Sequence, residues 1–320
     1  MNTELLWGQP VIWYLFLAGV GAGALTVSAS MFLRGGDDVR GMHVETARYG
    51  AFIAPLPVMI GSGLLIFELG SFEAGNWFRW INLYKVMNLS PMSVGTWLLT
   101  AFIGFSLIYA YTFVPNAPGL PNERRYPLRR LLCWFAIPLG VATAIYTGVL
   151  LGAMPSRPFW NTPILAMLFL ISSLSTGIAV ILLARAIHGK VGADADAERH
   201  HHYSGYLLTA SDVMLIGFEL LVIFLFIMYA HLTVGAVKEA VSVLFAGNLA
   251  ALFWLGVVVV GMLVPAAVEL IYVIPKLLYQ RAFKAPRGVE IAMPAAILVG
   301  GFLLRYVVVV AGQITGPIGI

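Results

Sequence analysis

The chain has 320 residues, of which 60% are hydrophobic and only 11% are charged, with a mean hydropathy of +0.89. Because soluble domains carry about 25% charged residues, this composition excludes a soluble protein and predicts an integral membrane protein embedded in a lipid bilayer. The net charge of +4 is spread over several loops, which excludes a nucleic-acid-binding patch. The single cysteine, Cys133, excludes a disulfide framework and an iron–sulfur cluster held by this chain alone.

Eight apolar segments are long enough to cross a bilayer as helices. They cover residues 9–33, 48–70, 91–114, 130–153, 162–187, 206–230, 244–274 and 290–315. The sequence therefore predicts an all-α integral membrane protein with eight transmembrane helices. Pro265 lies inside the seventh segment, so we expect that helix to kink or tilt.

Lys and Arg are distributed unequally between two sets of loops. Fourteen fall around the loops after the first, third, fifth and seventh predicted helices, and four fall in the other loops. Because positive loops stay on the cytoplasmic side, both termini are predicted to face the periplasm from a bacterial cytoplasmic (inner) membrane. The segment 71–90 contains Trp77, Trp80, Tyr84 and Lys85, and we expect it to lie at the outer membrane interface.

Short sequence patterns recur between the two halves of the chain. Trp7-x-x-Pro10 returns as Trp160-x-x-Pro163, 153 residues later. Four further recurrences keep the same order, with offsets of 151 to 157 residues. Four helices per half would make the repeats parallel, so we expect two similar four-helix bundles, covering residues 1–153 and 154–320.

Five ionisable residues lie inside the predicted helices, where a charge is costly and marks a candidate functional site. They are Glu68, Asp212, Glu219, Glu269 and Arg305. Glu68 lies near the outer end, Glu219 and Arg305 near the middle, and the other two nearer the cytoplasm. The set is consistent with a proton pathway, and equally with a buried pair of Glu219 and Arg305 that holds helices together.

The positions of the histidines argue against a haem, and those of two glycines indicate close packing of helices. A transmembrane b haem needs two histidines inside the membrane, whereas His43, His188 and the run His200–His202 fall in predicted cytoplasmic loops. The sequence therefore predicts no haem and no other metal site. Gly19 and Gly23 have small-xxx-small spacing, which indicates close helix packing rather than ligand contact.

Tyr146 lies 16 residues beyond Arg130, which is about 24 Å along a helix at ~1.5 Å per residue. It is therefore close to the outer membrane surface, where an ordinary aromatic belt is the alternative explanation. Four further polar or aromatic residues share this level: Gln9, Trp13, Tyr14 and Asn161. An apolar slot with hydrogen-bonding groups and a nearby acid fits a quinone and its two protons.

The stretch from Tyr146-Thr147-Gly148 through Arg157-Pro158-Phe159-Trp160-Asn161 resembles the junction of the fourth and fifth helices in the NrfD/PsrC family. These proteins are the quinone-binding membrane-anchor subunits of polysulfide reductase and related complexes. The beginning of the chain, from Trp13 to Gly23, is similar to the first helix of that family. The resemblance covers the whole chain and agrees with eight helices in two bundles.

The resemblance implies a subunit that has no redox metal and binds menaquinone or ubiquinone near the periplasmic face, with Tyr146 as a ligand. It also implies electron exchange with a ferredoxin-like iron–sulfur subunit and a catalytic subunit, a molybdopterin enzyme or a multihaem cytochrome. Arg157 and Trp160 are then candidates for partner docking, and the chain alone would not act on the terminal substrate. A secondary transporter with parallel repeats and a purely structural anchor are the alternatives.

Overall fold

The structure is a computed structural model that describes residues 7–35, 43–69, 79–85, 90–115, 117–189, 195–233, 235–279, 283 and 285–314. Within these ranges the chain forms helices and no strand. In sequence order they are α1 (Gln9–Arg34), α2 (Val44–Ile53), α3 (Pro55–Leu69), α4 (Arg79–Lys85), α5 (Pro91–Tyr111), α6 (Asn122–Gly152), α7 (Pro163–His188), α8 (Ala195–Leu232), α9 (Ala236–Phe245), the π-helix η2 (Leu252–Leu263), α10 (Val264–Tyr279) and α11 (Arg287–Ile314).

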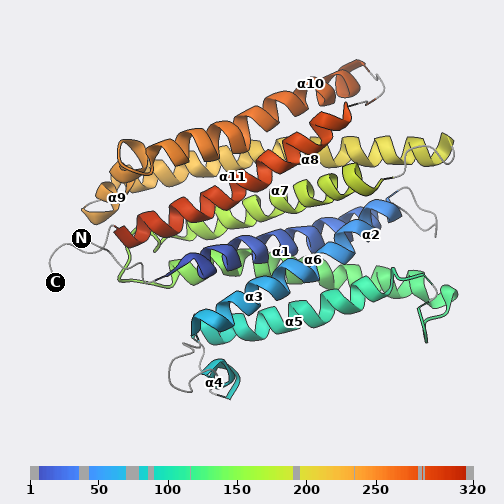
Figure 1. Cartoon of the computed structure of the whole chain (residues 1–320), viewed down its shortest axis with the longest axis horizontal. Coiled ribbons are helices and arrows are strands. Elements are labelled where there is room, and N and C mark those ends of the chain that lie inside the picture. The colour runs from blue at the N-terminus through green and yellow to red at the C-terminus, as the bar shows by residue number, and fades with distance from the viewer. Residues whose placement is uncertain are drawn as a thin grey trace.

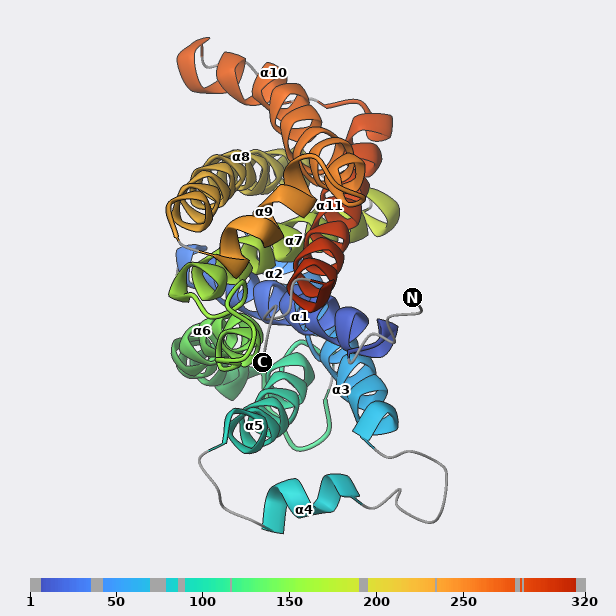
Figure 2. The same ribbon diagram turned by 90° about the vertical axis from the view of Figure 1, so that its left-hand side faces the viewer.

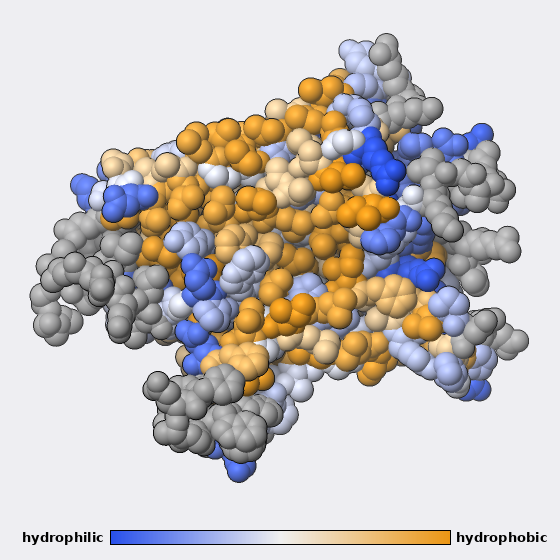
Figure 3. Space-filling view, in the orientation of Figure 1, coloured by the Kyte–Doolittle hydropathy of each residue, from blue (hydrophilic) through white to orange (hydrophobic). Residues whose placement is uncertain are grey.

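The long helices lie side by side along one axis (Figure 1). Helix α1 begins and α11 ends at the same end of the molecule, which we call the terminal end, and we call the other the opposite end. Among the described residues, eight helical stretches are long and apolar enough to cross a membrane, which confirms the predicted number. Apolar residues cover the middle of the face shown in Figure 3, and hydrophilic ones gather towards both ends.

The second predicted helix, 48–70, is divided. Helix α2 ends at Ile53 and α3 begins at Pro55, because proline has no backbone N–H to continue the hydrogen-bond ladder. In the following segment, residues 71–78 and 86–89 lie outside the described ranges. Residues 79–85 form α4, where the hydroxyl of Tyr84 lies 2.7 Å from that of Thr100.

The predicted start of the seventh helix, at residue 244, is wrong. Helix α9 ends at Phe245, Gly247 and Asn248 form a turn, and the membrane-crossing helix begins at Leu252. Glycine and asparagine favour turns, so the sequence contained this boundary signal. Near Pro265, where we expected a kink, the π-helix η2 passes into α10.

Helices α6 and α8 extend further towards the opposite end than their apolar segments. Helix α6 starts at Asn122 and α8 at Ala195, whereas the predicted starts were residues 130 and 206. The run His200–His202 therefore lies within α8, and its placement in a loop is wrong. Hydropathy marks only the apolar part of a helix and does not show how far a polar end projects beyond it.

Helices α1 and α7 touch through their backbones. A Cβ atom added to Gly23 would lie 1.8 Å from the carbonyl oxygen of Ser173, and one added to Gly177 would lie 2.3 Å from the carbonyl carbon of Gly23. This contact confirms the close packing predicted from the spacing of Gly19 and Gly23. Helix α1 also contacts α2, α3 and α6, and α7 contacts α8 and α11, so these two helices occupy the centre (Figure 2).

Candidate functional site

A cavity of about 160 Å³ opens near the terminal end between α1, α3, α4, α5 and α6. Its walls are mostly apolar and include Leu65, Leu83, Leu99 and Leu150. The polar side chains in the wall belong to Glu68, Thr96 and Tyr146, together with the indole of Trp7. An apolar slot with a few polar groups is the usual form of a small-molecule site.

Tyr146 is held against α5. Its side chain is 8% exposed, and its hydroxyl donates a hydrogen bond to the carbonyl oxygen of Pro91 at 3.0 Å. Gly95 lies one turn further along α5 and also lines the cavity. Because the phenolic proton is directed at Pro91, the oxygen of Tyr146 keeps its lone pairs for a ligand that donates a hydrogen bond.

Glu68 lies at the last turn of α3 and is exposed. Its Oε1 accepts a long hydrogen bond of 3.4 Å from the backbone N–H of Gly8. The carboxylate therefore lies beside the start of α1 and in the wall of the same cavity as Tyr146. Sequence reasoning had placed these two residues at one membrane depth, and the structure brings them into one cavity.

Trp7 lines the cavity and is hydrogen-bonded to Gln313 in the last turns of α11. The backbone N–H of Trp7 donates to Oε1 of Gln313 at 2.9 Å, and Nε2 of Gln313 donates back to the backbone carbonyl of Trp7 at 3.1 Å. The backbone carbonyl of Gln313 also accepts from Nη1 of Arg157 at 2.9 Å. The indole ring of Trp7 packs against that of Trp160, with centroids 5.5 Å apart.

The turn between α6 and α7 is packed into the molecule. Trp160 is 1% exposed, and its Nε1 donates to the carbonyl of Val308 on α11 at 2.9 Å. Thr162 caps α7, because its hydroxyl accepts from the backbone N–H of Ile164. The geometry gives Trp160 a packing role, whereas Asn161 is exposed.

Four residues predicted for the quinone site lie outside the cavity wall. Gln9 and Asn161 are exposed. Trp13 packs on Phe302 with ring centroids 4.3 Å apart, and Tyr14 is fully buried, with no hydrogen-bond partner for its hydroxyl among the described residues. Conversely, sequence reasoning missed the α4 and α5 wall, whose members Leu83, Gly95 and Thr96 carry no distinctive motif.

The remaining predicted ionisable residues are buried among α7, α8, α10 and α11. Arg305 donates to the hydroxyls of Ser172 (2.9 Å) and Ser173 (3.2 Å) and to the carbonyl of Gly301 (2.8 Å). The hydroxyl of Ser175 donates to Asp212 at 2.7 Å. Within the described part of the chain, Asp212, Glu219 and Glu269 each keep one carboxylate oxygen without a hydrogen-bond partner.

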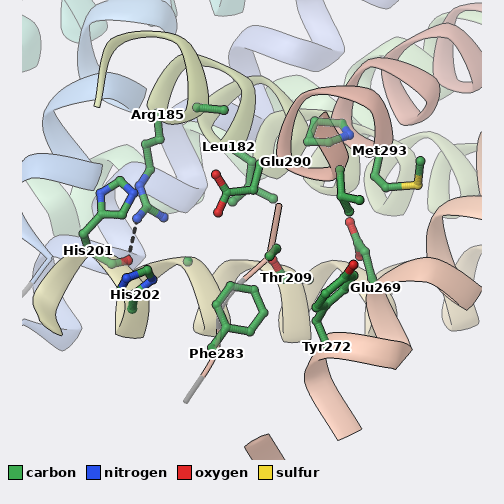
Figure 4. A pocket seen from close by; sticks show the side chains of 15 residues that line it. Leu182, Arg185, His201, His202, Thr209, Glu269, Tyr272, Phe283, Glu290 and Met293 are labelled. Atoms are coloured by element: carbon green, nitrogen blue, oxygen red, sulfur yellow. Dashed lines mark hydrogen bonds between the residues drawn. The ribbon is translucent and has the colours of Figure 1, made fainter. Parts of the chain in front are cut away.

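A second, smaller cavity of about 40 Å³ lies near the opposite end, where α7 ends and α8 and α11 begin. Figure 4 shows the side chains that line it. Glu269, Glu290 and Arg185 line it, and Nη2 of Arg185 donates to the backbone carbonyl of His201 at 2.6 Å. Nη1 of Arg185 has no partner among the described residues, although the side chain is only 5% exposed. The cavity therefore connects the buried carboxyl of Glu269 with polar groups near the end of the helices.

No group of three or more His, Cys, Asp or Glu side chains in the described ranges has an arrangement that could hold a metal ion. Cys133 is buried, and its thiol donates to the hydroxyl of Tyr109 at 3.6 Å.

The eight apolar helices define a multi-pass membrane protein with a mostly apolar cavity near its terminal end. The chain belongs to the NrfD family, since the family model described as "Polysulphide reductase, NrfD" matches residues 1–317. It is 31% identical to the C subunit of polysulfide reductase from Wolinella succinogenes, over 98% of this sequence and 95% of that one. It is 28% identical to the NrfD homolog of Haemophilus influenzae and 29% identical to NrfD of Escherichia coli, over 98% of this sequence and 96% of each relative.

Proposed function

We propose that this chain is the quinol-binding membrane subunit of a respiratory oxidoreductase complex. Membership of a family that includes a polysulfide reductase subunit supports the complex, and gives no support to the secondary-transporter alternative. The observation that carries quinol binding is the terminal cavity, in which Tyr146 and Glu68 face an otherwise mostly apolar space.

The size of the cavity fits one ring. A cavity of roughly 150 Å³ lined by apolar side chains binds benzene in another protein, and the cavity here measures about 160 Å³. The apolar walls suit a ring and the beginning of its isoprenoid tail. A bound quinol supplies two electrons and two protons when it is oxidised.

Hydrogen-bond polarity favours a ligand with O–H donors. The proton of Tyr146 is directed at Pro91, so its oxygen accepts from the ligand, and the side-chain oxygens of Glu68 are also acceptors. In this proposal Tyr146 orients the ring, and Glu68 receives the two quinol protons one after the other as the two electrons leave. Glu68 is exposed at the end of α3, so it can release each proton to water before it accepts the next.

The buried acids form the second part of the proposal. Asp212, Glu219 and Glu269, with Arg305 between α7 and α11, would carry protons between the cavity at the opposite end and the middle of the molecule. Free carboxylate oxygens on all three acids, within the described part of the structure, and the place of Glu269 in the opposite-end cavity support this route.

The orientation and the partners complete the proposal. The terminal end would face the periplasm, where a ferredoxin-like iron–sulfur subunit would dock near Arg157 and accept the electrons. That subunit would pass them to a catalytic subunit, a molybdopterin enzyme or a multihaem cytochrome. The proposed architecture includes the division into similar halves, 1–153 and 154–320.

Replacement of Tyr146 by phenylalanine tests the pocket. One neutral hydrogen bond contributes about 0.5–1.5 kcal/mol, so the variant is expected to bind a quinol analogue about twofold to tenfold more weakly. The measurement is fluorescence quenching of 2-heptyl-4-hydroxyquinoline N-oxide titrated into the full-length protein in lipid nanodiscs. Tyr229→Phe, which removes a hydroxyl outside the cavity, is the matched control.

Glu68→Gln separates binding from proton transfer in the same assay. It is expected to bind the analogue almost as wild type does but to slow quinol oxidation by the assembled complex. Wild-type binding and turnover in Tyr146→Phe would refute the pocket, and unchanged turnover in Glu68→Gln would remove that residue from the proton route.

A further inference from the structure

Gly95 lies on α5 directly against the phenol of Tyr146. A Cβ atom added to Gly95 would lie 1.7 Å from the Tyr146 hydroxyl oxygen, 2.0 Å from Cζ and 2.6 Å from Cε1. Real Cβ atoms essentially never approach another heavy atom within 3.0 Å. Any side chain at this position would therefore displace the tyrosine ring.

The backbone of Gly95 does not itself need glycine. The residue is part of the regular helix α5 and its φ is not in the left-handed region. Gly104, on the same helix, has no heavy atom within 4 Å of its added Cβ. What distinguishes Gly95 is the missing side chain, which leaves room for one particular ring.

The space left by the missing side chain of Gly95 determines the position of the Tyr146 hydroxyl. With the hydroxyl end of the ring against Gly95, the oxygen reaches the carbonyl of Pro91, one helical turn earlier, at 3.0 Å. A ring pushed away from α5 would lose this bond and regain a mobile phenolic proton. Because Tyr146 also lines the cavity, the same displacement would change the shape of the space next to Glu68.

We propose that Gly95 is a positioning residue of the quinol pocket, which acts only through Tyr146. It lets the phenol dock on α5, directs its proton towards Pro91 and keeps its lone pairs turned to the ligand. This inference rests on the proposed function, because it assumes that the terminal cavity holds the quinol ring.

A double-variant experiment tests the assignment, with the same fluorescent quinol analogue and the full-length protein in nanodiscs. Gly95→Ala is expected to weaken binding by tenfold or more, whereas the control Gly104→Ala stays within twofold of wild type. In a Tyr146→Ala background there is no ring to displace, so adding Gly95→Ala is expected to change the affinity by less than twofold. A residue that merely stabilises α5 would weaken binding equally in both backgrounds.

The outcomes separate this inference from the proposed function. Wild-type affinity in Gly95→Ala, together with a loss in Tyr146→Ala, would overturn only the role of Gly95. Wild-type affinity in Tyr146→Ala would overturn the pocket itself. If Gly95→Ala does not fold, the double variant is expected to restore folding because it vacates the space, and failure of the double variant to fold would overturn the inference.

Discussion

Replacing Gly23 by alanine is expected to force α1 and α7 apart. The new Cβ would lie 1.8 Å from the carbonyl oxygen of Ser173, whereas ordinary van der Waals contact begins at 3.4 Å, so the backbones must separate by about 1.6 Å. The obstacle is backbone, and no change of rotamer can relieve it. Overpacking of this kind costs about 1–3 kcal/mol, and the shift also strains the bond of 3.2 Å from Arg305 to the hydroxyl of Ser173.

Thermal unfolding in detergent, followed by intrinsic fluorescence, measures this cost. For 320 residues, a destabilisation of that size is expected to lower the Tm by about 1.5–4.5 °C. Gly63→Ala on α3 is the matched control, because its added Cβ meets no heavy atom within 4 Å. Equal Tm values for Gly23→Ala and Gly63→Ala would refute the reasoning, since they would mean that α1 and α7 are not in backbone contact.

Three further predictions concern His43, Gln313 and the orientation of the chain in the membrane. Burial, and then the charge of Arg34, lower the pKa of His43 from 6.5 in the folded protein. The folded state therefore binds a proton at His43 less readily than the unfolded state does. The contribution of His43 to stability is complete above pH 6.5 and is lost as the pH falls. Wild type should lose more Tm than His43→Asn between about pH 7.5 and 5.5, and parallel curves would contradict this. Gln313→Ala removes two hydrogen bonds to Trp7, each contributing about 0.5–1.5 kcal/mol. Because Trp7 lines the cavity, the variant should bind the quinol analogue more weakly. Unchanged affinity would exclude a role of this contact in the pocket. A reporter fused after Ile320 should be active only in the periplasm, and cytoplasmic activity would reverse the orientation.

The sequence indicated that Tyr146 and Glu68 lie at one level along the helices, but not which side chains turn to the same space. Both line the terminal cavity. Trp13 was predicted at the same level, yet it packs on Phe302 of α11, and Tyr14 is fully buried beside Tyr146 without lining the cavity. Successive side chains on a helix point about 100° apart, so direction depends on which helices are neighbours.

The hydrogen-bond partners of Arg305 are a second feature that could not be predicted from the sequence. Sequence reasoning paired it with Glu219, the ionisable residue at a similar depth. Arg305 and Glu219 do interact electrostatically, and both hydrogen-bond to Ser172. The other hydrogen bonds of Arg305 go to the hydroxyl of Ser173 and to a carbonyl on its own helix. Serine is common in helices that cross membranes, so nothing in the sequence marked these two residues as partners of a buried cation.

The paired hydrogen bonds between Trp7 and Gln313 have a consequence for biosynthesis. The two residues are separated by 306 positions, so Trp7 is synthesised well before Gln313. The wall of the terminal cavity at Trp7 can therefore be completed only after α11 has been made. A truncated protein that ends before Gln313 would contain every residue that lines the cavity and still lack the contact that holds Trp7 in place.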